Sequence, residues 1–222
     1  MKEAYEFQDL GRIAYPDALA VQTSAFEALL QAKAQDLPGE NKLFFCEHEP
    51  VFTLGKNGRK SNLLIPEAQL EENGFSFHSA SRGGDITYHG PGQITGYPVF
   101  DLEMFRLGLR QYIEILEEIV IAFLSVYGLK GERLAGAAGV WLDAHTPGAR
   151  KICAVGVKSS RYVTMHGFAL NIRTDLSAYA LIHPCGLVGK GVTSLDREVG
   201  EPLDFEETKT LLRSLFARKF FR

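Results

Sequence analysis

The chain has 222 residues, of which 45% are hydrophobic and 23% charged, and its formal net charge is −3. This length is enough for one large domain or two small ones with a well-formed core. The composition is typical of a globular protein and argues against a disordered one. The slightly negative charge argues against a general nucleic-acid binder, and no apolar run approaches the roughly 20 residues of a membrane span.

Residues 1–6 lack the apolar core of a signal peptide. The three cysteines, Cys46, Cys153 and Cys185, occur at unrelated spacings and therefore predict no disulfide framework. We expect a protein of the reducing cytoplasm that acts without a membrane or a nucleic-acid partner.

The first predicted element is a helix that begins at Pro16, because proline is favoured in the first helical turn. Its inward stripe consists of Leu19, Gln22, Ala25, Phe26, Leu29 and Leu30. Strand-like runs follow at residues 43–46, 51–54, 75–79 and 94–100, and the basic segment 55–62 is predicted to be an exposed loop.

The clearest helix covers about residues 109–127 and ends at Gly128. Three strand-like runs follow at residues 139–142, 152–157 and 163–172. A last helix begins at Asp204, where a capping box with Glu207 is predicted. Helices interspersed with hairpin-like strand pairs indicate an α/β fold, in the sense of an α+β mixed sheet with flanking helices.

Residues 82–93 contain four glycines, a proline, Arg82, Asp85 and His89 between two apolar segments. Glycine weakens a strand interior, so such a segment is typical of a backbone that approaches a ligand closely. An ordinary Gly/Pro-rich hairpin loop explains the composition equally well. The composition leaves both readings open.

Cys185 lies between Pro184 and Gly186, a context that favours a turn presenting the thiol. A free cysteine is more often a small core hydrophobe, which is what we expect of Cys46 and Cys153 inside their apolar strand patterns. Cys185 is either a core residue or a nucleophile on this pattern alone.

A nucleophilic Cys185 needs a neighbour that promotes its thiolate. The candidates are Lys151, His183, His89 and His166, each of which alone is more often structural. A lysine can serve as a nearby positive charge or, when burial lowers its pKa, as a base.

A zinc site built from these histidines with Cys153 and Cys185 lacks the paired ligand spacing of structural zinc sites. The glycines of residues 82–93 also match neither common phosphate-binding pattern. We therefore predict no metal and no phosphate cradle.

Four segments together resemble the lipoyl(octanoyl) transferases. The family signature Arg-Gly-Gly-x-x-Thr-aromatic-His-x-x-Gly-Gln, followed by Tyr, matches residues 82–93 and Tyr97. Lys-Ile with a small-residue strand matches residues 151–156, His-Gly-x-Ala-Leu-Asn matches 166–171, and Pro-Cys-Gly matches 184–186. The segments appear in family order, and the resemblance covers about residues 5–217.

This resemblance implies transfer of an octanoyl (or lipoyl) group from acyl carrier protein to a lysine of a lipoyl domain, in a 2-oxoacid dehydrogenase or the glycine-cleavage H protein. The route is a cysteine thioester, and the step begins endogenous protein lipoylation. The resemblance also implies the fold of lipoate- and biotin-protein ligase catalytic domains, as one domain over residues 1–222 with helix 204–222 packed on it. No cofactor is implied, because the donor thioester is already activated.

Carried over residue by residue, the resemblance makes Cys185 the nucleophile and Lys151 the residue that promotes its thiolate. The lining that it implies for the acyl tunnel is Arg82, Gly83, Gly84, Asp85, Ile86, Thr87, Tyr88, His89, Ala154, Val155, Gly156, Gly167, Phe168 and Ala169.

Because acyl carrier proteins are acidic, we expect a basic rim to guide their docking. The candidate rim residues are Lys56, Arg59, Lys60, Arg150, Lys158 and Arg161, each of which alone is better explained as a solvated charge. Two rival functions stay open: an ATP-dependent lipoate or biotin ligase on the same fold, which needs no cysteine, and a non-catalytic acyl-binding protein.

Overall fold

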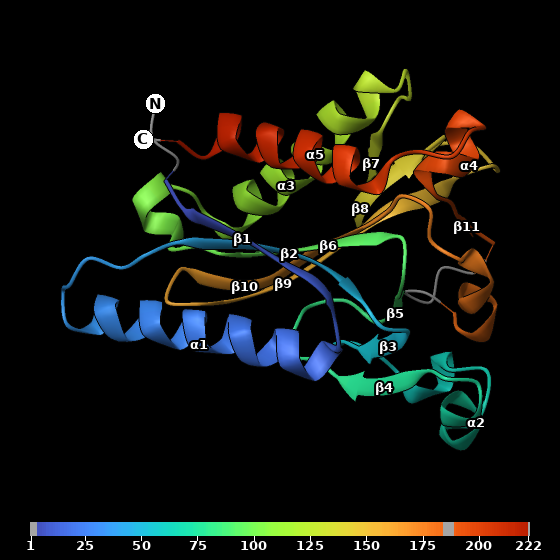
Figure 1. Ribbon diagram of the computed structural model, residues 1–222, viewed down its shortest axis with the longest axis horizontal. Helices are drawn as coiled ribbons and strands as arrows, with labels where there is room; N and C mark the ends of the chain where they lie inside the picture. Colours follow the sequence, from blue (N-terminus) through green and yellow to red (C-terminus); the bar gives the residue numbers. More distant parts are fainter. Residues whose placement is uncertain (1–3, 184–188, 222) are drawn as a thin grey trace.

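In the computed structural model, which describes residues 4–183 and 189–221, a mixed sheet carries helices on both faces (Figure 1). Within these ranges the sheet has eight strands in the order β1-β2-β6-β10-β9-β8-β7, with β11 beside β9. Their bounds are Glu6–Ile13 (β1), Lys42–His48 (β2), Gln93–Val99 (β6), Val163–Asn171 (β10), Arg150–Ser160 (β9), Ala137–Leu142 (β8), Glu132–Leu134 (β7) and Gly191–Val192 (β11).

A smaller sheet, in the order β4-β3-β5, lies beside the main one. It consists of β3 (Val51–Leu54), β4 (Ser76–Ser79) and β5 (Ile86–His89). Strand β5 pairs antiparallel with β3, and the chain then turns through residues 90–92 into β6 of the main sheet. The two strands around this glycine turn therefore belong to different sheets, and the simple hairpin considered from the sequence is wrong.

Helix α1 (Tyr15–Ala34) covers one face of the main sheet, whereas α3 (Leu109–Val126) and α5 (Phe205–Lys219) cover the other (Figure 1). The shorter helices are α2 (Glu67–Glu72), α4 (Leu195–Val199), η1 (Lys60–Asn62), η2 (Leu102–Phe105) and η3 (Leu176–Leu181). Among the described helices, none combines the length and apolarity needed to cross a membrane.

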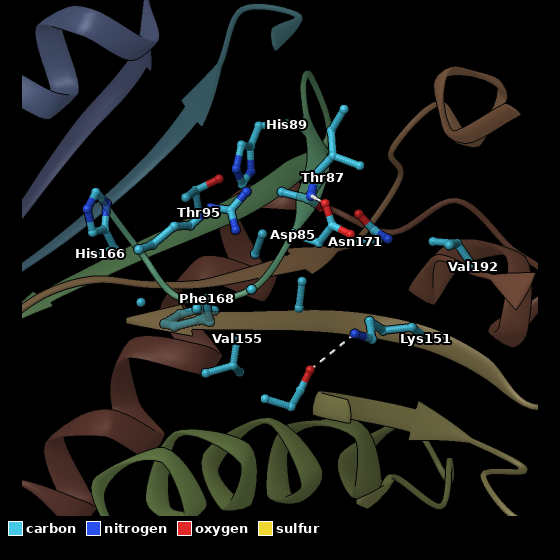
Figure 2. Close-up of a pocket in the computed structure, with 18 of the residues that line it drawn as sticks. Asp85, Thr87, His89, Thr95, Lys151, Val155, His166, Phe168, Asn171 and Val192 are labelled. Carbon is cyan, nitrogen blue, oxygen red and sulfur yellow. Dashed lines mark hydrogen bonds between the residues drawn. The ribbon is translucent and has the colours of Figure 1, made fainter. Parts of the chain in front are cut away.

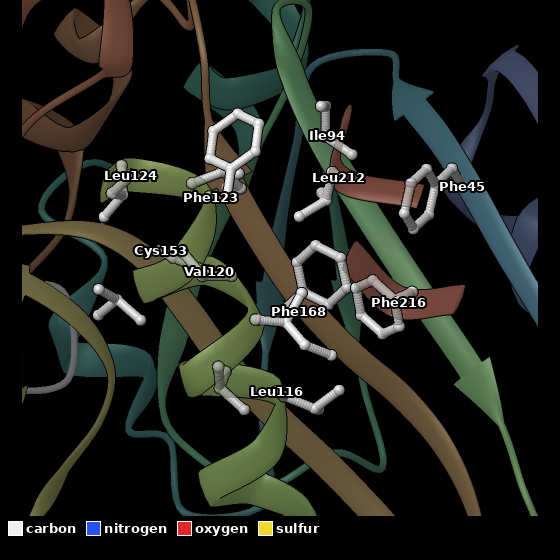
Figure 3. Packing of buried hydrophobic residues seen from close by; sticks show 14 of the residues in the cluster. Phe45, Ile94, Leu116, Val120, Phe123, Leu124, Cys153, Phe168, Leu212 and Phe216 are labelled. Carbon is white, nitrogen blue, oxygen red and sulfur yellow. The ribbon is translucent and has the colours of Figure 1, made fainter. Parts of the chain in front are cut away.

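The main core lies between the sheet and the α3/α5 layer (Figure 3). Val120 and Phe123 of α3 pack with Leu212 and Phe216 of α5 against the sheet, and all four are fully buried. The Phe216 ring stacks on Phe168 of β10 with centroids 5.5 Å apart. This face of the sheet has the dense apolar packing that supplies most folding free energy.

The predicted helices at 109–127 and from Asp204 are confirmed as α3 and α5, and the predicted strands correspond to β2, β3, β4, β6, β8, β9 and β10. Asp204 caps α5 by accepting hydrogen bonds from the backbone N–H groups of Glu206 and Glu207. The patterns missed β1, which is largely exposed and carries mixed polarity, and β5, whose four residues lie among glycines.

Candidate active site

One pocket lies between the main sheet and the smaller sheet, with β9, β10 and β6 on one side and the segment leading into β5 on the other (Figure 2). Much of its lining is apolar, from Ile86, Val155 and Phe168. The expected binding residues found in the lining are Arg82, Gly84, Asp85, Ile86, Thr87, His89, Ala154, Val155, Gly156, Gly167, Phe168 and Ala169. Three motifs that are far apart in sequence thus meet around one cavity.

Gly83 and Tyr88, which were also expected in the lining, are not part of it. The Gly83 N–H donates to the backbone oxygen of Val157, at 2.9 Å, and so ties the loop to β9. The Tyr88 ring points into the core of the smaller sheet, where it packs against Phe52 and Phe75. Side chains alternate across a strand, so Thr87 and His89 of β5 can face the pocket while Tyr88 faces away.

Glycine is required at two places in the pocket wall, one for its backbone conformation and one for close packing between neighbouring strands. Gly84 has a φ of +81°, a left-handed conformation that glycine adopts without a Cβ clash. A Cβ on Gly167 would lie 2.2 Å from the backbone oxygen of Gly96 on the neighbouring strand. The small residues therefore allow the backbone itself to form part of the pocket wall.

His166 is an unusual strand residue because its φ is +60°. Its Nε2 is 3.0 Å from the Ser81 hydroxyl, and its backbone N–H donates to Gln22. Burial, reinforced by the positive charges of Arg82 and Lys158, lowers the pKa of His166 to about 3. This imidazole is therefore neutral at neutral pH.

Arg82 brings a positive charge into the wall and is only 9% exposed. Its guanidinium donates to the Thr53 backbone oxygen at 2.7 Å, to the Thr53 hydroxyl at 2.8 Å and to the Gly83 carbonyl at 2.9 Å.

Burial, together with the charges of neighbouring His48 and Arg82, holds the pKa of His89 well below its ordinary value. Arg82 and neutral His89 thus form a polar stretch of the wall.

Lys151 lies at the opposite end of the pocket from His166 and His89 (Figure 2). Its ammonium donates to the backbone oxygen of Ala138 at 3.1 Å and lies 4.7 Å from the centroid of the Trp141 ring. A cation over an indole face is favourably placed. This arrangement holds the charged end of Lys151 at the pocket rather than in open solvent.

The predicted nucleophile, Cys185, lies outside the described residues. His183, the last described residue before it, is exposed, and its backbone N–H donates to the backbone oxygen of Asn62 at 2.8 Å. Cys46 and Cys153 are buried in the core, as predicted, and burial raises the pKa of both thiols. Neither is placed to react with an exposed substrate.

His166, which the sequence singled out as a candidate neighbour of Cys185, also lines the pocket. The lining residues that were not expected from the sequence are Tyr15, Thr95, Tyr97, Ala138, Asn171, Tyr179 and Val192. Tyr97 and Asn171 lie within the matched motifs, so the motifs were the signal that could have identified them. The others come from separate elements and enter the pocket only through the packing of the two sheets.

The candidate rim cations have different surroundings. Lys56 and Arg59 are exposed, and Lys60 pairs with Glu67 at 2.7 Å. Arg150 is held by Glu198 and Asp143. Lys158 lies over the Phe26 ring, and Arg161 is exposed in the turn after β9. Lys56, Arg59 and Arg161 are the members of the six that are exposed and lie in no ion pair among the described residues. Within residues 4–183 and 189–221, no cluster of three His, Cys, Asp or Glu side chains could hold a metal ion.

Solved structures share this fold. A bipartite lipoate protein ligase from Thermoplasma acidophilum, studied with its E2 lipoyl domain, aligns with a TM-score of 0.71 and 14% identity over 99% of this chain and 84% of that one. A biotin protein ligase from Aquifex aeolicus, in complex with biotin and ATP, aligns with a TM-score of 0.54 and 11% identity over 97% of this chain and 70% of that one. At such low identities the likeness concerns the fold alone.

Closer relatives carry one functional name. A curated octanoyltransferase from Parabacteroides distasonis is 67% identical over 98% of this chain and 99% of its own. Another from Flavobacterium johnsoniae is 49% identical over 95% of this chain and 94% of its own. The family model of the lipoyl protein ligase A/B catalytic domain matches residues 14–217. The chain therefore belongs to the lipoyl protein ligase A/B catalytic domain family, and its near-full-length likeness to these enzymes makes it an acyltransferase.

Proposed function

We propose that this enzyme transfers an octanoyl group from an acyl carrier protein to a lysine of a lipoyl domain, through a thioester on Cys185. The observation that carries the proposal is the largely apolar pocket between the sheets, which has Lys151 at one end. An octanoyl chain buries about seven CH2 and CH3 groups, each of which contributes about 0.8 kcal/mol in an apolar site. The relatives named octanoyltransferases favour this acyl group over others.

The proposed reaction has two steps. The Cys185 thiolate attacks the carbonyl carbon of the octanoyl carrier, and the carrier thiolate leaves and takes up a proton. The amine of the acceptor lysine then attacks the Cys185 thioester, loses a proton and forms an amide, while the Cys185 thiolate leaves. The first step exchanges one thioester for another, and the second is strongly downhill, so the transfer needs no ATP.

Lys151 is proposed to promote the Cys185 thiolate. Val192 on one side of Cys185 in sequence and Tyr179 on the other both line the pocket, and Val192 pairs with Lys151 in the sheet. A fixed ammonium near a thiol stabilises the thiolate by charge. Backbone N–H groups of the glycine-containing walls are suited to stabilise the oxyanion of each tetrahedral intermediate.

The donor is proposed to dock on exposed cations that include Lys56 and Arg59. The acceptors are proposed to be the lipoyl domains of 2-oxoacid dehydrogenases and the glycine-cleavage H protein. We also propose that the chain forms one catalytic domain, because the family match reaches residue 217 and Leu212 and Phe216 of α5 belong to the main core.

The test is the intact mass of the full chain after incubation with octanoyl carrier protein and no acceptor. We expect a gain of about 126 Da, the mass of C8H14O, on the one proposed nucleophile. The gain should disappear in Cys185→Ala and persist in Cys153→Ala, which removes a buried cysteine as a matched control. No adduct on the wild-type chain under turnover conditions contradicts the proposal.

The same variants, assayed for transfer with and without ATP, separate the rival functions. An ATP-dependent ligase remains active in Cys185→Ser and requires ATP with free octanoate or lipoate. A non-catalytic acyl-binding protein retains the acyl carrier without forming an adduct. Transfer to a lipoyl domain that is independent of ATP and lost in Cys185→Ser supports the transferase alone.

A further inference from the structure

A continuous chain of buried hydrogen bonds lies behind the pocket wall. It begins at the Arg82 guanidinium, which donates to the Thr53 hydroxyl at 2.8 Å. The Thr53 hydroxyl is 3.2 Å from Nε2 of His89, and Nδ1 of His89 is 2.8 Å from Oε1 of Gln93. Gln93 then donates to Oδ1 of Asn171 at 2.9 Å. Thr53 and Gln93 are fully buried and lie outside the pocket lining.

Backbone carbonyls determine the orientation of the two amides. Nε2 of Gln93 lies 3.2 Å from the carbonyl oxygen of Tyr88, and Nδ2 of Asn171 lies 3.0 Å from that of Thr193. A carbonyl oxygen only accepts hydrogen bonds, so these nitrogens must face it. The Oε1 atom of Gln93 is thereby turned toward His89.

The orientation of Gln93 determines the tautomer of His89. An amide oxygen only accepts, so Nδ1 of His89 must carry the hydrogen. The depressed pKa of His89 keeps the ring neutral, which leaves Nε2 as an acceptor. The Thr53 hydroxyl already accepts from Arg82, and its own hydrogen is available for Nε2. Each hydrogen bond that links one member of this chain to the next therefore runs in the same direction, from Arg82 toward Thr193.

We propose that Thr53 and Gln93 are positioning residues, which hold Arg82 against the pocket wall and keep His89 in its Nδ1–H tautomer through this single directed chain. Hydrogen bonds that share one direction polarise one another and so favour one arrangement. Three hydrogen bonds, to the Thr53 backbone oxygen and hydroxyl and to the Gly83 carbonyl, fix the position of the guanidinium in the pocket wall. The inference rests on the proposed octanoyl transfer only for its kinetic consequence.

The expected kinetic effect concerns acyl binding. His89 lies at the end of the pocket away from Lys151 (Figure 2), and Arg82 is joined to His89 through the Thr53 hydroxyl. Breaking the chain should therefore weaken binding of the octanoyl donor and leave the chemical step intact. The other charged and titratable groups that act on His89 are His48, Arg82 and His166, and a substitution at Thr53 replaces none of these side chains.

The central variant is Thr53→Val, which keeps the branched shape and removes the hydroxyl. Thr53→Ser is its partner, because serine retains the hydroxyl. Thr208→Val is the matched control, since Thr208 is equally buried but its hydroxyl donates to a carbonyl of its own helix, that of Phe205. Nitrogen NMR of the histidine rings in the full chain identifies the tautomer of His89. Steady-state kinetics with octanoyl carrier protein measures KM and kcat.

We expect His89 of the wild type to be neutral and protonated at Nδ1 from pH 6 to 8. In Thr53→Val the tautomer should stay Nδ1–H, because Oε1 of Gln93 still accepts from Nδ1. KM for the donor should rise about tenfold while kcat stays within about twofold, as expected when ground-state binding alone is lost. Thr53→Ser and Thr208→Val should match the wild type in both readouts.

An Nε2–H tautomer or a protonated His89 in the wild type overturns the proposal, as does an unchanged KM in Thr53→Val. A fall in kcat at constant KM overturns the positioning role. A wild-type chain that transfers no octanoyl group contradicts the proposed function. The measured tautomer of His89 still tests the hydrogen-bond chain in that case, because it does not depend on activity. If Thr53→Val does not fold, Gln93→Glu replaces it: a carboxylate beside Nδ1 should raise the pKa of His89, and an unchanged pKa overturns the proposal.

Discussion

The two faces of the main sheet differ in what they bury. The face toward α3 and α5 buries mainly apolar side chains, such as Leu116, Val120 and Phe123 (Figure 3). The face toward α1 and the smaller sheet buries polar groups as well, among them Arg82 and His166. Phe168 belongs to both, because its ring stacks in the core and also lines the pocket. Stability is concentrated on one face and binding on the other, so substitutions should separate the two.

The largest expected effect is on the pocket side. Lys151→Ala should lower acyl transfer about a thousandfold, which corresponds to about 4 kcal/mol of transition-state stabilisation. The melting temperature should change little, because Lys151 is only partly buried. Single-turnover transfer and thermal unfolding measure the two properties. Lys130→Ala, at an exposed lysine paired with Glu132, is the control and should retain full activity.

A loss of activity under tenfold in Lys151→Ala would remove Lys151 from its proposed role. Alkylation of Cys185 sharpens the test, since its rate profile should move to higher pH in Lys151→Ala. An unchanged profile would mean that Lys151 acts on something other than the thiol.

The next effect belongs to the core face. Phe123→Ala should cost about 3–5 kcal/mol in the free energy of unfolding, from lost burial and the cavity left behind. The activity of the folded fraction should stay within about threefold, because Phe123 does not line the pocket. Urea unfolding and kcat/KM per folded enzyme test this. Val126→Ala on the same helix, at a residue 61% exposed, should cost less than about 0.5 kcal/mol.

Acidification should destabilise the pocket side. His166 has its pKa lowered to about 3 in the folded state, so between that value and about 6.5 the unfolded chain binds more protons. Stability therefore rises with pH in this window, and His166 alone should cost about 2 kcal/mol between pH 7 and pH 5. His48, whose pKa is lowered to about 4 by burial, adds to this loss.

His166→Asn tests the assignment, because asparagine tolerates the positive φ of this position and does not titrate. Urea unfolding at pH 7 and pH 5 should show a smaller pH dependence in the variant than in the wild type. An equal change in the free energy of unfolding between pH 7 and pH 5 in the variant and the wild type would assign the acid sensitivity to other groups.

The smallest expected effect is at the surface. Lys56→Glu combined with Arg59→Glu should raise KM for the carrier several-fold and weaken its salt dependence, because exposed charges act mainly on encounter. Arg218→Glu with Lys219→Glu, on the exposed end of α5, reverses the same number of charges as a control. Equal KM values for the two double variants would contradict docking near Lys56 and Arg59.

Local pattern predicted the elements whose burial is one-sided. The apolar positions of α3 repeat at helical spacing, and the structure buries most of them, among them Tyr112, Leu116 and Phe123. Strand β5 gave no such signal, because its residues lie between glycines and become a strand only by pairing with β3. Tyr88 shows the same limit within the site: the motif includes it, but strand alternation turns its ring away from the pocket.

The sequence by itself determined the elements with one-sided burial and the chemistry-bearing motifs, since spacing, caps and residue types are local properties. Only the tertiary structure decided that Arg82, His166 and Lys151 share one pocket, and that Tyr15 and Val192 complete it. It alone also aligned Thr53, His89 and Gln93 into one directed hydrogen-bond chain. The physical reason is that these contacts join strands of two sheets, and no local pattern records which strands become neighbours.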